Sequence, residues 1–144
     1  MSYTISEAAR IAGFAPTTIR YYDKEGLLPY VGRKGNNRVF EESDIRWLCL
    51  LNCLKNTGMP IKRIREYVEL VKRGDASLAE RFALIKDQRQ FVQDQIEQLE
   101  YYMQALDFKE WYYKKAIALG SETAINMEDY ERETGKCFPD NGGK

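Results

Sequence analysis

The most reactive side chains in this sequence are three cysteines, at positions 49, 53 and 137. Cys49 and Cys53 are four positions apart, so a helix would place both on one face. The chain has no histidine and fewer cysteines than a Cys-only zinc site or an iron–sulfur cluster usually takes. The sequence therefore predicts no metal site and no cofactor. An odd number of cysteines also argues against a disulfide framework and favours a reducing, cytoplasmic environment.

The sequence does not predict an enzyme. General base catalysis most often uses histidine, which is absent, and no paired acid motif, phosphate loop or nucleophile constellation is present. The net charge of zero conceals two halves of opposite sign. Residues 1–74 hold 13 basic and 8 acidic side chains, whereas residues 75–144 hold 9 and 14. A basic first half suits a polyanionic partner, although a charge of this size is also ordinary for a protein surface.

Two short helices joined by a tight turn are predicted at the start of the chain. Thr4 and Glu7 form a capping box for a helix that stops at Gly13. Pro16 suits the first turn of a second helix, which runs from Thr17 to Glu25. This pattern predicts a helix-turn-helix whose second helix carries hydroxyls, an arginine and tyrosines suited to base edges and phosphates.

A basic hairpin is predicted directly after the second helix. Gly35, Asn36 and Asn37 are turn formers flanked by residues that favour strands, so residues 30–40 are expected to form a small β wing. Cations at its tip can neutralise phosphates. The residues expected to contact DNA on the helix and wing are Thr17, Thr18, Arg20, Tyr21, Tyr22, Arg33, Lys34, Asn37 and Arg38.

Two further helices complete the first half. One is expected from about Glu42 to Gly58, with Cys49 on its apolar face as a small core residue. Pro60 opens the next helix, and Lys62 lies near its start, where free backbone N–H groups can face a phosphate. The alternative for Lys62 is an ordinary solvated face.

A long uninterrupted helix is predicted from about Ala76 to Leu119, because this stretch contains neither glycine nor proline. At about 1.5 Å per residue it would be about 66 Å long. Apolar residues recur along it with the alternating spacing of a heptad seam, broken at Arg89 and Glu110. A single helix cannot bury such a seam, so a partner chain is expected, and a monomeric helical hairpin is the alternative. The seam consists of Leu78, Phe82, Ile85, Val92, Ile96, Leu99, Met103, Leu106, Tyr113 and Ile117.

The first half of the chain resembles the winged-helix DNA-binding domain of the MerR family. The match runs from Ile19 to Pro29 and continues at Arg38–Phe40 and Asp44–Ile45. The family usually has a tyrosine where this chain has Val39 or Phe40. The resemblance implies an all-α fold with a small β wing, made of a DNA-binding domain (1–73), a dimerisation helix forming an antiparallel coiled coil (74–119) and a short tail (120–144). It also implies a homodimer that binds a palindromic operator and distorts promoter DNA for RNA polymerase.

The segment 51–58 resembles the aldehyde- and electrophile-responsive subgroup of this family, which carries a lone cysteine where this chain has Cys53. The resemblance implies that Cys53 is a sensor of reactive electrophiles or thiol stress, and plain packing is the alternative. The competing function is an architectural or excision-type adaptor that bends DNA without an inducer. The aromatic residues between Tyr101 and Tyr113 are expected to cover an interface rather than to line a ligand pocket.

Overall fold

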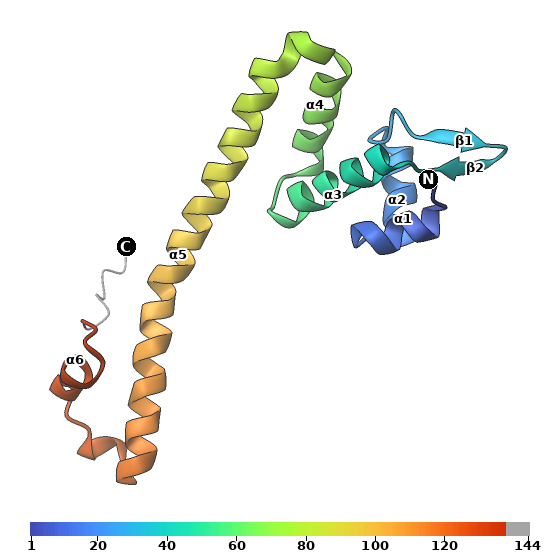
Figure 1. Ribbon diagram of the computed structural model, residues 1–144. Helices are drawn as coiled ribbons and strands as arrows, with labels where there is room; N and C mark the ends of the chain where they lie inside the picture. The colour runs from blue at the N-terminus through green and yellow to red at the C-terminus, as the bar shows by residue number, and fades with distance from the viewer. Residues whose placement is uncertain (138–144) are drawn as a thin grey trace. The chain divides into compact units, whose positions relative to one another are not determined.

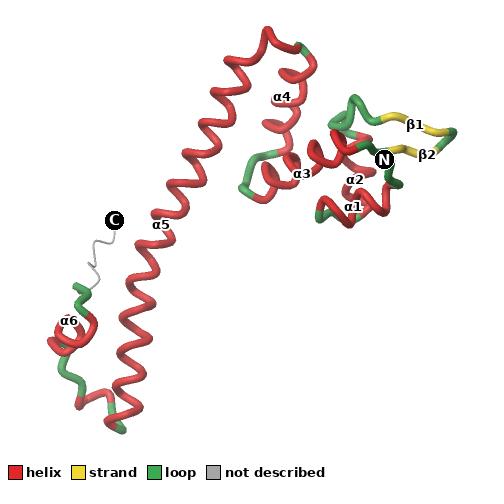
Figure 2. The backbone as a smooth tube through the Cα atoms, in the orientation of Figure 1, coloured by secondary structure: helices red, strands yellow, loops and turns green. Residues whose placement is uncertain are grey.

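The computed structural model describes residues 1–137 and divides the chain into two compact units, residues 1–90 and residues 91–144. The described part is helical apart from one small hairpin, as predicted (Figures 1 and 2). None of its helices is long and apolar enough to cross a membrane. The helices are α1 (Ile5–Ala12), α2 (Pro16–Lys24), α3 (Glu42–Asn56), α4 (Ile61–Lys72), α5 (Leu78–Leu119) and α6 (Glu128–Thr134), and the strands are β1 (Gly32–Lys34) and β2 (Asn37–Val39).

Local signals in the sequence set the boundaries of α1 and α2. The Glu7 amide donates to Thr4 Oγ1 at 3.2 Å and the Thr4 amide donates to Glu7 Oε2 at 2.9 Å, which confirms the capping box. Gly13 ends α1 with a left-handed φ of 79°, and Pro16 occupies the first position of α2. The turn between the two helices is therefore tight, which makes a helix-turn-helix.

The wing is an antiparallel pair of three-residue strands in which Gly32 faces Val39 and Lys34 faces Asn37. The turn between the strands begins at Gly35, whose φ of 65° suits a residue without a side chain. Phe40, which is fully buried, exchanges two backbone hydrogen bonds with Tyr3 at 2.7 and 2.9 Å. The chain just before α1 is thereby tied to the base of the wing.

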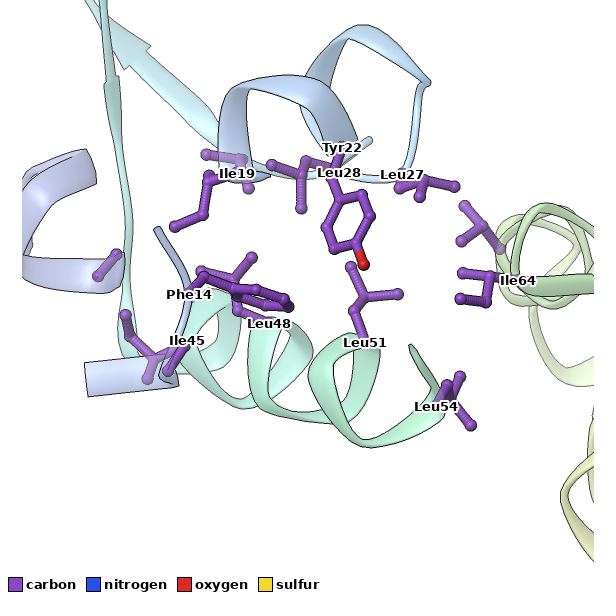
Figure 3. Packing of buried hydrophobic residues seen from close by; sticks show 14 of the residues in the cluster. Phe14, Ile19, Tyr22, Leu27, Leu28, Ile45, Leu48, Leu51, Leu54 and Ile64 are labelled. Carbon is purple, nitrogen blue, oxygen red and sulfur yellow. The ribbon is translucent and has the colours of Figure 1, made fainter. Parts of the chain in front are cut away.

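One apolar core holds the first unit together, and α3 lies along one side of it (Figure 3). Leu48 and Leu51 of α3 are fully buried, against Ile19 and Tyr22 of α2 and Ile64 of α4. Trp47 stacks on Tyr67 with ring centroids 5.9 Å apart, and its indole N–H donates to the Leu27 carbonyl at 2.8 Å.

The first turns of α5 belong to the same unit. Leu84 is buried in its core, and the Gln88 amide donates to the Thr57 carbonyl at 3.2 Å and to Thr57 Oγ1 at 2.9 Å. The side chains of Ser77 and Arg81 form hydrogen bonds that hold the turn between α4 and α5. The compact unit therefore extends to Gln90, beyond the predicted division at residue 73, because these residues of α5 pack against α3 and α4.

In the second unit, the segment after α5 packs back on the C-terminal half of that helix. Tyr130 of α6 is buried, with its ring centroid 5.0 Å from that of Phe108 and 5.3 Å from that of Trp111. The Trp111 indole donates to Glu133 Oε2 at 2.8 Å, and Lys115 also binds Glu133. Phe108 and Trp111 of α5 thus form an interface with α6 of the same chain, whereas Tyr101, Tyr102 and Tyr113 are exposed.

Candidate nucleic-acid interface

The second helix of the motif, α2, has one buried side and one exposed side. Ile19 and Tyr22 are buried, so residues on the opposite side must face outward on a helix with 3.6 residues per turn. Thr17, Arg20 and Tyr21 are exposed and Thr18 is half-buried. Arg20 forms no ion pair with any residue from 1 to 137, so its guanidinium is available to a ligand.

The structure corrects the prediction for Tyr22. Its side chain is 2% exposed, and its ring makes an edge-to-face contact with Phe14 at 5.3 Å between centroids. Burial raises the pKa of the Tyr22 hydroxyl above its ordinary value near 10.0, and the neighbouring Tyr21 adds to the rise. Tyr22 is therefore a core residue that anchors α2, and only Tyr21 of the adjacent pair presents its ring to solvent.

The wing presents a polar, positively charged surface. Arg33, Lys34 and Asn37 are exposed, and the strand register places Lys34 directly opposite Asn37 beside the turn. Lys34 has no acidic partner among residues 1–137. These side chains can approach a phosphate or a groove edge without first breaking a hydrogen bond.

Arg38 differs from the other wing residues, because its guanidinium is bound within the protein. Nε donates to Asp23 Oδ2 at 2.8 Å, Nη2 donates to Asp23 Oδ1, and Nη1 donates to the Val31 carbonyl at 2.7 Å. Arg33 lies 4.0 Å from the same carboxylate. The DNA contact of Arg38 stays a prediction, and its bidentate pair with Asp23 fixes the wing to α2.

Asp23 was not identified from the sequence as a functional residue. An acidic side chain on a helix expected to bind a polyanion is a weak signal, and only the fold shows that it faces the wing. With Arg38 half-buried beside it, the Asp23 carboxylate is already neutralised, so it does not oppose the free charges of Arg20 and Lys34.

An open groove of about 790 Å³ lies between α2 and the wing. Its lining combines Arg20 and Asp23 of α2, the charged wing residues and the segment that leads into α1. Because both walls carry free cations, the groove can accept a phosphodiester backbone while α2 contacts base edges.

A second open groove, of about 330 Å³, lies at the beginning of α2 and is lined by Thr17, Thr18 and Tyr21 together with Lys55 and Ile61. Lys62, the first cation of α4, is exposed next to Ile61. Lys55 joins the predicted contact residues here, and sequence reasoning had not placed it at this surface.

All three cysteines are exposed thiols. The prediction that Cys49 is a core residue is wrong: the core-facing side of α3 is made by Ile45, Leu48, Leu51 and Leu54, and Cys49 lies on the outer side. Cys53 is on that same outer side, so it does not lie in a packed helix junction either. No group of three or more metal-binding side chains is found among residues 1–137.

A helix-turn-helix with a basic wing, an exposed second helix and a groove between them defines the class of winged DNA-binding proteins. Comparison with known proteins supports this class. The family model described as "MerR HTH family regulatory protein" matches residues 3–70, and the model described as "MerR, DNA binding" matches residues 45–107. A helix-turn-helix transcriptional regulator from Haemophilus influenzae is 46% identical over 128 residues, which is 88% of this chain and 95% of the relative.

Solved structures give the same result. The crystal structure of HiNmlR, a MerR family regulator lacking the sensor domain, bound to promoter DNA, matches with a TM-score of 0.82 and 46% identity, covering 88% of this chain and 96% of that one. The regulator AdhR of Bacillus subtilis is 36% identical over 87 residues, which is 60% of this chain and 62% of the relative. The chain belongs to the MerR family of transcription regulators, and these relatives support a place in its AdhR/NmlR-like subgroup. It is a DNA-binding regulator rather than an enzyme.

Proposed function

We propose that this protein regulates transcription as a homodimer that binds a palindromic promoter operator and distorts the DNA between its two half-sites. The observation that carries the proposal is the apolar seam of α5, which is exposed along most of its length. Leu99 and Ile117 are 67% and 81% exposed, and Phe82 is 69% exposed. Exposed apolar residues that recur at heptad spacing along a helix mark a surface for a partner helix.

The described part of the chain does not cover the seam. Inside the second unit, α6 packs on Phe108 and Trp111, which lie on a different side of α5 from Leu99 and Leu106. This arrangement disfavours the monomeric hairpin, because the returning segment leaves Leu106 64% exposed. A second copy of α5 is the occupant that fits, since a heptad seam pairs with another such seam.

A dimer presents two copies of α2 and the wing to one DNA duplex. Two-fold related recognition helices bind half-sites separated by whole helical turns, so the operator is expected to be palindromic. Bending and untwisting the DNA between two fixed half-sites costs about 1–10 kcal/mol, which phosphate contacts to both wings offset. Such a distortion can bring promoter elements into register for RNA polymerase. The promoter-bound structure of HiNmlR supports this proposal.

The proposed input is covalent modification of Cys53 by aldehydes or other electrophiles. Its thiol is exposed in the protomer, so a small electrophile can reach it. It lies on α3, whose inner side carries the core that positions α2, so a change at this helix can be transmitted to the DNA-binding surface. The AdhR and HiNmlR relatives support the subgroup, and the response itself is the proposal.

The dimer and the DNA surface are tested with two variants. Ile96→Glu combined with Leu99→Glu should yield a monomer that loses operator affinity, because charges would have to be buried in the seam. Arg20→Ala should leave the dimer intact and weaken operator binding by about 1–3 kcal/mol. Sedimentation and fluorescence anisotropy measure both effects, and Glu131→Ala on the exposed side of α6 is the matched control. A parent protein that is monomeric at micromolar concentration would refute the proposal.

The input is tested by promoter activation with an aldehyde or a quinone in Cys53→Ser, Cys49→Ser and Cys137→Ser. Loss of the response in Cys53→Ser alone, with operator binding retained, is the expected result. A full response in Cys53→Ser would exclude this cysteine as the sensor. If the unmodified dimer bends DNA equally with and without an inducer, the architectural function is favoured instead.

A further inference from the structure

Two charged residues interrupt the apolar seam of α5. Arg89 and Glu110 stand at positions where the alternating spacing of the seam calls for apolar side chains. Both are exposed, and neither has an ion-pair partner among residues 1–137. A charged residue in a coiled-coil seam costs stability unless it is paired, and it restricts the orientation and register in which the helices can associate.

We propose that the two copies of α5 associate in a single antiparallel register, selected by an ion pair between Arg89 of each protomer and the partner's Glu110. The inference rests on the dimer proposed above and adds the register and the residues that select it. The two-fold axis makes the pair occur twice, once on each side of the centre of the coiled coil.

The seam itself indicates the register. In an antiparallel pair, the two kinds of seam position face each other in layers. When Ile96 faces the partner's Leu99, Val92 faces the partner's Met103 and every seam position has a counterpart, from Leu78 at one end to Ile117 at the other. No other shift of whole heptads uses the complete seam.

In this register, Arg89 and the partner's Glu110 lie in adjacent layers. They are four residues apart along the axis, or about 6 Å at about 1.5 Å per residue, which two long side chains can span. A parallel pair would instead place each charge beside its own copy, Arg89 against the partner's Arg89 and Glu110 against the partner's Glu110. Like charges in a partly dehydrated seam repel, so the parallel orientation is disfavoured.

Charges beside the seam favour the same register. Lys86 and Asp107 occupy flanking positions, and the proposed register places Lys86 opposite the partner's Asp107. Lys86 is exposed and has no acidic partner among residues 1–137, whereas Asp107 is half-buried with Lys136 Nζ at 3.3 Å. Flanking charges of opposite sign set partner orientation in coiled coils.

A shift by one heptad that moves the centre of the coiled coil toward the C-terminus removes this complementarity. If Ile85 faced the partner's Ile117, Lys86 would lie opposite the partner's Lys114 and Glu100 opposite the partner's Glu100. That shift would also leave Leu78 and Phe82 without counterparts, although they are 55% and 69% exposed in the protomer. The opposite shift would place Lys86 opposite the partner's Glu100, but it would leave Tyr113 and Ile117 without counterparts. Only the proposed register therefore combines complementary charges with a complete apolar seam.

Charge reversal tests the ion pair. Arg89→Glu and Glu110→Arg should each raise the dimer dissociation constant about tenfold or more, because each leaves like charges facing one another. The double variant Arg89→Glu with Glu110→Arg restores opposite charges and should return close to the parent value. In a parallel dimer, each single reversal would only exchange one repulsive pair for another. Sedimentation equilibrium measures all four proteins, and circular dichroism checks that the helices remain folded.

The matched control is Glu97→Arg, which makes the same substitution as Glu110→Arg at an exposed position outside the seam. It should leave the dissociation constant within a few-fold of the parent value. If Arg89→Glu behaves like this control while the parent protein is dimeric, the register pair is refuted and the dimer is not.

Spin-label distances test the register independently. With the native cysteines replaced by serine, labels are attached at Glu97→Cys in one sample and at Gln104→Cys in another. The proposed register brings the two labels at 97 almost level, whereas the labels at 104 lie about 20 Å apart along the axis. A parallel dimer would give equal distances. A shift by one heptad would either make the pair at 104 the closer one or separate the labels at 97 by about 9 Å along the axis. Either result would overturn the proposal.

Discussion

The helix-turn-helix core of this chain and the seam of α5 differ in how far they bury their apolar residues within one protomer. In residues 1–90, Leu48, Leu51 and Ile64 are buried within one protomer, and the polar groups that tie the wing to α2 are paired as well. In the second unit, Leu99, Met103 and Leu106 form an apolar surface that is more than half exposed. The DNA-binding unit therefore completes its own core, whereas α5 carries surface that only a further chain can cover.

This difference separates two properties of the regulator. The shape of the DNA-binding surface depends on contacts inside one protomer, whereas the separation of two such surfaces depends on contacts between protomers. A mutation in the core of the first unit should change folding stability, and a mutation in the seam should change association.

The largest effect is expected for Leu48→Ala. Leu48 is fully buried, so its truncation leaves a cavity and should lower the free energy of unfolding of the first unit by about 2–5 kcal/mol. Urea denaturation followed by circular dichroism measures the change. Leu99→Ala is the matched control, because it removes the same atoms from an exposed seam position and should weaken association rather than intramolecular stability. Equal effects of both variants on dimer dissociation would contradict the comparison.

Tyr130→Ala should release α6 from α5. The ring is buried against Phe108 and Trp111, and burial of an aromatic side chain stabilises the docked form by about 1.5–3 kcal/mol. Hydrogen exchange of the α6 amides should accelerate while operator affinity stays unchanged. Tyr130→Phe keeps the ring contacts and should preserve protection. Protection of α6 that survives loss of the ring would show that polar contacts alone hold it.

Asp23→Ala should loosen the wing without unfolding the unit. It removes the two carboxylate oxygens that accept hydrogen bonds from the half-buried Arg38 guanidinium, and should cost about 1–2 kcal/mol of stability. Operator affinity, measured by anisotropy, should fall even though an acidic charge has been removed from the surface. Glu25→Ala is the control, since Glu25 is on the same segment and pairs with Arg65 instead. Tighter binding by Asp23→Ala would show that charge matters more than wing position.

The smallest effect is a pH dependence of α6 docking. Hydrogen bonds from Lys115 and Trp111 lower the pKa of Glu133 below its ordinary value of 4.5. The ionised carboxylate therefore stabilises docking above this ordinary value, and the contribution is lost as the pH falls through the lower, folded-state pKa. The effect is small because the carboxylate is exposed to solvent. Shifts of the Tyr130 ring protons in NMR spectra should report it, and Glu133→Gln should remove this pH dependence.

Much of the fold follows from local signals in the sequence. The capping box at Thr4, the proline at residue 16 and the turn at Gly35 act over a few residues, so they could be identified without tertiary information. The seam of α5 was also visible, because a long heptad pattern has few alternative explanations. The MerR resemblance added the expected order of the domains.

The contacts that could not be predicted from the sequence join residues that are far apart along the chain. Arg38 and Asp23 are fifteen positions apart and meet only because the wing folds back on α2. Trp111 and Glu133 are twenty-two positions apart and require the reversal after α5. The errors at Tyr22 and Cys49 have another cause: periodicity in α2 and α3 could not decide which of two adjacent or nearly adjacent residues faces the core.

The placement of the two tryptophans has a practical consequence. The chain contains only Trp47 and Trp111, one in each unit, and each indole N–H donates a 2.8 Å hydrogen bond, to the Leu27 carbonyl and to Glu133 respectively. Indole emission responds to hydrogen bonding and to solvent around the ring. Trp111→Phe therefore leaves a protein whose fluorescence reports the DNA-binding unit alone, and Trp47→Phe leaves one that reports the docking of α6. Binding of operator, association of protomers and release of the tail can thus be timed separately, with optical labels that the sequence already contains.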